Sequence, residues 1–167
     1  MGLIKIEDNA YFMTLTIALI NPEIPPNTGT IARLCAATDA HLHIVGKANF
    51  DLSEKSLKRA GLDYWHLVDV REYPDIKRYV DDCDLLTTFV VTTKTTKLYT
   101  DIQYPKTATL LFGNESSGLP EWIHTHFRET RVTIPMKNVE KGMRSLNLAN
   151  AVSIVLYEAI RQHSIKT

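Results

Sequence analysis

Short apolar runs alternate along this chain with segments whose hydrophobic residues recur at helical spacing. The runs are rich in β-branched residues and too short for helices, so they predict buried strands at 13–20, 42–45, 85–92, 108–112 and 132–134. A proline-rich loop is expected at 21–28, and helices at about 29–38, 52–61, 75–82, 120–127 and 145–163. Strands that alternate with helices throughout predict an α/β fold with a mostly parallel sheet flanked by helices.

Polar residues and a proline indicate where some of these helices begin. Asn27 or Thr28 is expected to cap the helix after the proline-rich loop, and Ser145 or Asn147 the last helix. Pro120 suits the first turn of the helix that it opens.

The last helix is apolar over more than one stripe. Leu148, Val152, Val155 and Ala159 share one face, and Leu146, Ala149 and Ile160 lie beside it. The surface helix of a monomer should be polar on its far side. Two interpretations stay open: a second subunit covers the extra apolar face, or the face is buried inside one domain.

A single domain accounts for the length of 167 residues and for the uniform composition. The first twelve residues carry no periodic pattern, whereas a strand-like run begins at Met13. We therefore expect an N-terminal extension over 1–12, natural or added during cloning, and one domain over 13–167.

Charge and cysteine usage exclude several classes of protein. The 19 basic and 19 acidic residues cancel, so any RNA contact must come from a local patch or from a surface that two subunits share. Cys35 and Cys83 belong to no metal-binding motif and the histidines lack ligand spacing, so neither a disulfide framework nor a metal site is expected. With no apolar run of about 20 residues and no signal peptide, we expect a cytoplasmic protein without a membrane span.

The first of three unusual segments is NTGTIAR, from Asn27 to Arg33. Arg33 follows Ile31 by two residues, about 200° around a helix, so it should face away from the core. Thr30 and Ala37 flank it and are small, which would let another backbone approach. A solvated helix arginine is the ordinary alternative.

The second segment, LLFGNESSGLP, is a buried strand that runs into a loop bracketed by Gly113 and Gly118. Ligands of open α/β sheets bind outside the carboxyl ends of the strands, and a glycine lets a ligand approach the backbone. Glu115 can cap a helix, bind a ligand amine or hold the loop. Taken alone, a strand–glycine–helix pattern is weak evidence for a ligand site.

The third segment contains IPM at 134–136, a lysine-containing loop and RSLNLAN at 144–150. Capping can explain Ser145 and Asn147, but it does not explain Asn150, because asparagine is a poor helix-interior residue. The sequence contains no P-loop, GxGxxG, HExxH or GxSxG motif.

In this order and spacing, the three segments resemble the signature motifs of the trefoil-knot (SPOUT) RNA methyltransferases. Within that family the chain is most like the enzymes that methylate the wobble-nucleotide ribose of tRNA. The resemblance spans about 13–161 and is carried by PEIPPNTGTIARLCAAT, KRAGLDYW, TTK, LLFGNESSGLP and IPM…RSLNLANAVSIVLYEA.

The resemblance implies a deep C-terminal trefoil knot, a tight homodimer, S-adenosylmethionine as methyl donor, no metal, and the tRNA anticodon stem-loop as substrate. Arg33 would enter the site of the other subunit. By position, the implied residues are catalytic Arg33, Asn27 and Asn147; cofactor-binding Val91, Gly113, Glu115, Gly118, Ile134, Met136, Ser145, Leu146 and Asn150; and RNA-binding Lys94, Arg144 and Tyr157. The chain departs from the family pattern at Ser116 and Ser117 and in a longer loop at 137–143.

The expected reaction is in-line methyl transfer from a sulfonium to a ribose 2′-oxygen, in which most of the catalysis can come from positioning. An arginine keeps its proton in proteins, so we expect Arg33 to hold a phosphate or stabilise a forming alkoxide rather than act as a base. Further basic residues available for RNA are Lys55, Lys58, Arg59, Lys97 and Lys141.

Three alternative functions stay open. The chain could methylate another tRNA or rRNA nucleotide, or it could bind cofactor and RNA without catalysis. A small-molecule enzyme on a doubly wound fold is the third alternative, but it predicts a phosphate-binding glycine fingerprint, which is missing.

Overall fold

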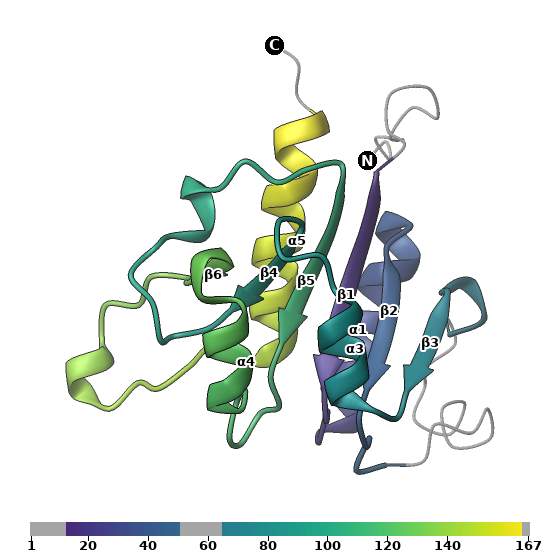
Figure 1. Ribbon diagram of the computed structural model, residues 1–167, viewed down its shortest axis with the longest axis horizontal. Helices are drawn as coiled ribbons and strands as arrows, with labels where there is room; N and C mark the ends of the chain where they lie inside the picture. Colours follow the sequence, from purple (N-terminus) through teal and green to yellow (C-terminus); the bar gives the residue numbers. More distant parts are fainter. Residues whose placement is uncertain (1–12, 51–64, 165–167) are drawn as a thin grey trace, which may run out of the picture.

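A computed structural model describes residues 13–50 and 65–164 of the chain (Figure 1). Its six strands form one sheet in the order β3-β2-β1-β5-β4-β6, and every neighbouring pair is parallel. The predicted α/β class and parallel sheet are therefore confirmed. The strands are β1 Thr14–Ile20, β2 His41–Val45, β3 Val70–Tyr73, β4 Thr88–Val91, β5 Thr107–Phe112 and β6 Arg131–Val132.

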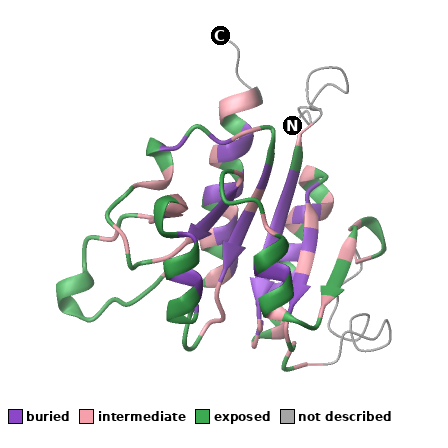
Figure 2. Ribbon diagram, in the orientation of Figure 1, coloured by how far each residue is buried: buried purple, intermediate pink, exposed green. Residues whose placement is uncertain are grey.

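Helices cover both faces of the sheet (Figure 1). α1 (Pro25–Thr38) and α5 (Leu148–Ser164) pack on one face, while α3 (Ile76–Asp82) and α4 (Glu121–His126) pack on the other. Successive strand residues point to opposite faces, so both cores draw on the same strands, which Figure 2 shows as the buried centre. The four 3₁₀ turns among the described residues are η1 Trp65–Leu67, η2 Tyr99–Asp101, η3 Arg128–Thr130 and η4 Val139–Lys141.

The first helix begins earlier than the sequence predicts. α1 starts at Pro25, inside the expected loop, because proline suits the first helical positions, where no backbone N–H is needed. Ile24 occupies the N-cap position without a side-chain cap. The predicted cap at Asn27 or Thr28 is wrong, since both residues lie buried inside the helix.

Asn147 caps the last helix, as one of the two predicted alternatives had it. Its Oδ1 atom accepts a hydrogen bond of 3.2 Å from the backbone N–H of Asn150, and α5 begins at Leu148. Ser145 therefore lies before the helix, and the predicted start at 145 is wrong by three residues. Asn150 lies in the first turn of α5, where its backbone N–H donates to this cap.

Other boundaries also differ from the prediction. β4 begins at Thr88 rather than at 85, because Asp84 forms a turn in which its side chain accepts a 2.7 Å hydrogen bond from the N–H of Leu86. β6 covers two residues and ends before the predicted 133–134, and Pro120 precedes α4 as its N-cap. β3 was not predicted. The predicted helix at 52–61 and the extension at 1–12 lie outside the described residues.

The carboxyl ends of the parallel strands meet at one edge of the sheet. β1 and β5 are neighbours there, with Leu19 opposite Phe112, although β2, β3 and β4 lie between them in the sequence. The segments that follow β1, β4, β5 and β6 are thereby brought together, and such a switch point is where open α/β sheets bind ligands.

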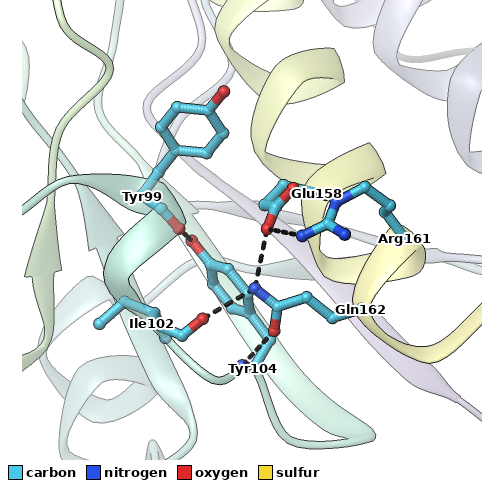
Figure 3. Close-up of polar contacts among 6 residues, drawn as sticks. All are labelled: Tyr99, Ile102, Tyr104, Glu158, Arg161 and Gln162. Carbon is cyan, nitrogen blue, oxygen red and sulfur yellow. Dashed lines mark hydrogen bonds and ion pairs between the residues drawn. The ribbon is translucent and has the colours of Figure 1, made fainter. Parts of the chain in front are cut away.

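The end of α5 holds the connection between β4 and β5 (Figure 3). The Gln162 side-chain amide donates a 2.8 Å hydrogen bond to the Ile102 carbonyl and accepts one of 2.9 Å from the Tyr104 N–H. The Tyr104 hydroxyl donates to the Tyr99 carbonyl at 2.9 Å. These bonds fix the return path of a connection whose first residues, Thr92 and Thr93, line the cavity described next.

Candidate active site at the carboxyl edge of the sheet

A cavity of about 360 Å³ opens at the carboxyl edge of the sheet. All three unusual segments of the sequence contribute to it, which confirms that the fold brings them together. The predicted site residues that line the cavity are Asn27, Val91, Gly113, Glu115, Gly118, Ile134, Met136, Ser145, Leu146 and Asn147.

The carboxylate of Glu115 joins the second segment to the start of α1. It accepts hydrogen bonds from the backbone N–H groups of Glu23 (2.9 Å) and Ile24 (3.2 Å) and from the side-chain amide of Asn27 (2.9 Å). In return, the Glu23 carboxylate accepts a 3.2 Å hydrogen bond from the Ser116 N–H. Glu115 thus serves as a remote, negatively charged partner for a helix N-terminus that has no cap of its own.

Asn27 extends this connection to the third segment. Its Oδ1 atom accepts a 2.9 Å hydrogen bond from the side-chain amide of Asn147, whose own oxygen caps α5. One chain of hydrogen bonds therefore runs from Glu115 through Asn27 and Asn147 to the N-terminus of α5. It sets the relative positions of both helix N-termini at the cavity.

The loop after β5 needs its two glycines for its own backbone. A Cβ atom on Gly113 would lie 2.3 Å from the carbonyl carbon of Gly118, and Gly118 has a φ of +69°. The Gly118 N–H donates a 3.1 Å hydrogen bond to the Asn114 carbonyl and closes the loop. The expectation that Gly113 is there to admit a ligand therefore has a competing explanation, because self-packing alone demands glycine.

Apolar side chains form much of the cavity wall. The sequence interpretation missed nine lining residues, which are Ile24, Thr92, Thr93, Phe112, Asn114, Leu119, Thr133, Leu148 and Ala151. Each lies within a few residues of a predicted site residue. Their proximity to the strand ends was the available signal, but without the fold it does not say which neighbours face inward.

Five predicted site residues lie outside the cavity lining of this single chain: Arg33, Lys94, Arg144, Asn150 and Tyr157. Arg33 is exposed on α1 together with Thr30 and Ala37, as its helical position predicts. Tyr157 is half exposed on α5.

Lys94 forms an ion pair beside the cavity. Its ammonium group lies 3.0 Å from a carboxylate oxygen of Glu121, and both side chains are mostly exposed. The hydrogen bond from Lys94 holds the pKa of Glu121 below its ordinary value.

No three His, Cys, Asp or Glu side chains within 13–50 and 65–164 gather closely enough to hold a metal ion. In the same part of the chain, no helix has the length and apolarity needed to cross a bilayer.

Comparison with known proteins matches residues 14–157 to the SpoU rRNA Methylase family. The chain is 42% identical over 154 residues to a Yersinia pestis tRNA (cytidine(34)-2′-O)-methyltransferase, covering 89% of this chain and 93% of that one. A solved structure described as giving structural insights into the 2-OH methylation of C/U34 on tRNA is 38% identical, with a TM-score of 0.76. The match covers 90% of this chain and 96% of that one. The SpoU methyltransferase AviRb from Streptomyces viridochromogenes, in complex with AdoMet, is 25% identical with a TM-score of 0.75, covering 94% of this chain and 60% of AviRb.

The family match spans every described strand and the cavity-lining segments at 24–27, 112–119 and 133–151. The identity over nearly full-length relatives agrees with this match. This chain belongs to the SpoU rRNA Methylase family.

Proposed function

We propose that this chain is a tRNA ribose 2′-O-methyltransferase that transfers a methyl group from S-adenosylmethionine to the wobble nucleotide, a cytidine or uridine at position 34. One observation carries the proposal. The cavity at the carboxyl edge joins all three motif segments, in a chain that is 42% identical to a tRNA (cytidine(34)-2′-O)-methyltransferase over 93% of its length. The structure described under C/U34 methylation supports the same nucleotide.

The size and the lining of the cavity support S-adenosylmethionine as its ligand. Its volume of about 360 Å³ lies within the range of roughly 300–1,000 Å³ that small-molecule sites occupy. Val91, Phe112, Ile134 and Leu146 offer apolar surface for an adenine, and the relative AviRb is described in complex with AdoMet. Bound there, S-adenosylmethionine supplies a methyl group already activated by its sulfonium.

We assign direct cofactor contacts to the lining residues Val91, Gly113, Gly118, Ile134, Met136, Ser145 and Leu146. Glu115 and Asn150 act on the cofactor site indirectly, because the Glu115 carboxylate binds the start of α1 and the Asn150 N–H binds the Asn147 cap. We keep Asn27 and Asn147, which line the cavity and are joined side chain to side chain, as the catalytic candidates that position the target ribose.

The chain's own catalytic contribution is positioning and charge. Arg33 keeps its proton, so it holds an RNA phosphate or stabilises the developing 2′-alkoxide. Methyl transfer from a sulfonium needs no metal-activated group, and we propose none.

A homodimer would bring Arg33 to a cavity. In one chain Arg33 lies on the exposed stripe of α1 and does not line the cavity. Ile154 and Tyr157, at 36% and 50% exposure, leave apolar surface on α5, which packs beside α1. We propose that a second copy covers this surface and receives Arg33 in its site. The apolar stripes named from the sequence follow the second interpretation instead, because Val152, Val155 and Ala159 are buried within the single chain.

Lys94 and Arg144 are our candidates for contact with the tRNA anticodon stem-loop, since both are exposed, whereas Tyr157 lies on the surface that we assign to the second copy. We place the reaction in the cytoplasm, together with its tRNA substrate. We assign the activity to one domain over 13–167, and the trefoil knot stays a prediction that the resemblance implies.

The test is to incubate the purified protein with labelled S-adenosylmethionine and total tRNA and to map the methyl group by nuclease digestion. Methyl on the ribose of nucleotide 34 supports the proposal. Methyl on another tRNA nucleotide, or on rRNA only, overturns the assigned substrate, and cofactor binding without transfer overturns catalysis. The Arg33→Lys variant tests the role of the guanidinium, because retained activity contradicts a bidentate contact.

A further inference from the structure

Residues 137–143 form an excursion from the rim of the cavity. The preceding residue Met136 and the nearby Ser145 both line the cavity, so the excursion leaves and rejoins the chain at the site. Figure 1 shows the excursion, with η4 near its tip, standing apart from the sheet and the helices. We call residues 137–143 the basic arm.

The basic arm has a defined turn. The Asn138 carbonyl accepts hydrogen bonds from the N–H groups of Lys141 (3.0 Å) and Met143 (3.2 Å). Gly142 adopts a φ of +93°, and its N–H donates to the Val139 carbonyl at 3.0 Å. The arm therefore presents its side chains from a folded turn, and glycine relieves the backbone strain at the reversal.

Positive charge is concentrated on this arm. Lys137 and Lys141, with the adjoining Arg144, stand against the single carboxylate of Glu140, and all four are exposed. The chain as a whole has a formal net charge of zero, so this local excess is not a general property of its surface.

The cations of the arm and the adjoining Arg144 also differ in pairing from six other described cations, which form ion pairs. Within the described residues, no ion pair or side-chain hydrogen bond joins Lys137, Lys141 or Arg144 to another side chain. By contrast, many other described cations lie within 4 Å of a carboxylate, namely Arg71, Lys77, Arg78, Lys94, Arg128 and Arg161. Binding an anion through the arm therefore requires no existing ion pair to break.

We propose that the basic arm binds RNA phosphates next to the nucleotide that enters the cavity, with Lys137 and Lys141 as contact residues. The inference rests on the proposed function, because the arm's base is the rim of the site where the target ribose must enter. Phosphate contacts fix the register of a nucleic acid without reading its sequence, which is what a flexible cation on a rim can supply. In this way a protein of zero net charge can still hold a polyanion.

The experiment compares tRNA binding by the full chain and by the double variant Lys137→Gln/Lys141→Gln, as a function of salt. The matched control is Lys77→Gln/Arg78→Gln on α3, which removes the same charge from cations paired with Asp81 and Asp82. Each lost phosphate contact should lower the slope of log K against log[salt] by roughly 0.7 for a single-stranded loop. We expect a slope shallower by about 1.4 and an affinity about 10-fold weaker near physiological salt for the arm variant only. S-adenosylmethionine affinity, measured by calorimetry, should stay unchanged.

An arm variant that binds tRNA with the wild-type slope and affinity overturns the inference while the proposed function stands. A weaker dimer for the arm variant, measured by analytical ultracentrifugation with tRNA affinity unchanged, also overturns it and makes the arm a subunit contact, as the half-exposed Val139 and Met143 would permit. Wild-type protein that neither binds nor methylates tRNA overturns the proposed function and the inference together. An equal loss in the α3 control contradicts any special role of the arm.

Discussion

Glu115 connects two distant parts of the chain through one side chain. Its replacement can show whether this carboxylate holds the loop and α1 together or contacts the cofactor directly. A glutamine in its place would turn one carboxylate oxygen into a donor that faces the N–H of Glu23 or the donors of Ile24 and Asn27. We expect Glu115→Gln to lower the free energy of unfolding by about 1–3 kcal/mol, because charge-assisted hydrogen bonds are lost and a donor meets a donor. Urea denaturation followed by circular dichroism measures the change.

Glu129→Gln is the matched control for this prediction. Glu129 pairs with Arg128 only at 3.8 Å and its side chain is 91% exposed, so its loss should cost less than about 0.5 kcal/mol. If Glu115→Gln instead retains full stability but loses S-adenosylmethionine affinity, Glu115 contacts the cofactor directly and the capping role is wrong.

His43, which contacts Tyr79 on the face of the sheet that α3 covers, should make the stability of the protein sensitive to acid. Its Nδ1 lies 2.8 Å from the Tyr79 hydroxyl, and burial, helped by the positive charges of Arg71 and His41, lowers the pKa of His43 to about 4. Between pH 6.5 and 4 the unfolded chain binds a proton here that the folded chain does not, so stability is full above pH 6.5 and falls on acidification. Because His43 is partly exposed, solvent weakens these effects, and we expect a loss of about 1–2 kcal/mol in the free energy of unfolding.

Urea unfolding at pH 7 and at pH 4.5 measures this loss, and His43→Gln supplies the comparison. The variant should show a smaller difference between the two pH values, by about the amount attributed to His43. The same difference in both proteins would mean that other groups cause the acid sensitivity.

At the scale of elements, the sequence predicted the strands and helices that depend on the local pattern of apolar residues. Buried runs gave β1, β2, β4 and β5 with errors of a few residues, because apolar periodicity and strand length are local signals. β3, with the sequence VREY, was missed because it is a half-exposed edge strand with a charged centre. The start of α1 was missed for a different reason. The N–H groups of Glu23 and Ile24, just before the helix, bind Glu115, which lies far away in sequence.

The β4–β5 connection provides a prediction that belongs to this scale. Gln162→Ala would leave the Ile102 carbonyl and the Tyr104 N–H without their partner on α5 (Figure 3). Both residues are buried, so we expect a loss of about 1–3 kcal/mol in the free energy of unfolding. The Tyr104 amide proton should also exchange faster in native-state hydrogen exchange.

Arg161→Gln is the neighbouring control, since Arg161 is 58% exposed and pairs with Glu158 on its own helix. It should leave the exchange of the Tyr104 amide proton unchanged, even though it costs stability by removing two hydrogen bonds from Glu158, whose side chain is 10% exposed. Unchanged Tyr104 exchange in Gln162→Ala would show that the connection is held by packing rather than by these hydrogen bonds.

At the scale of the whole molecule, about half of the cavity-lining residues could be identified before the structure, but their partners could not. Gly113, Ser145 and Asn147 belong to recognisable motifs, whereas the link from Asn27 to Asn147 joins residues that only the fold brings together. Contacts with a second copy of the chain cannot be predicted from the pattern of residues in one chain. Arg33 is the clearest case, because its outward direction follows from helical spacing but its destination does not.

Subunit mixing tests that destination. Arg33→Ala keeps the cavity but removes the arginine, and Leu146→Asp keeps Arg33 but places a carboxylate in the apolar cavity wall. If Arg33 works in the partner's site, each variant alone is nearly inactive, but a mixed dimer regains one intact site. Random exchange makes about half of the dimers mixed, so methyl transfer should recover to about a quarter of the wild-type rate.

The control mixes Arg33→Ala with the double variant Arg33→Ala/Leu146→Asp, which restores no site in either arrangement. Native mass spectrometry confirms that the mixed dimers form. If they form and activity stays at the level of the separate variants, Arg33 acts within its own subunit. Its exposed position on α1 would then require RNA itself, rather than a second chain, to bridge the arginine to the cavity.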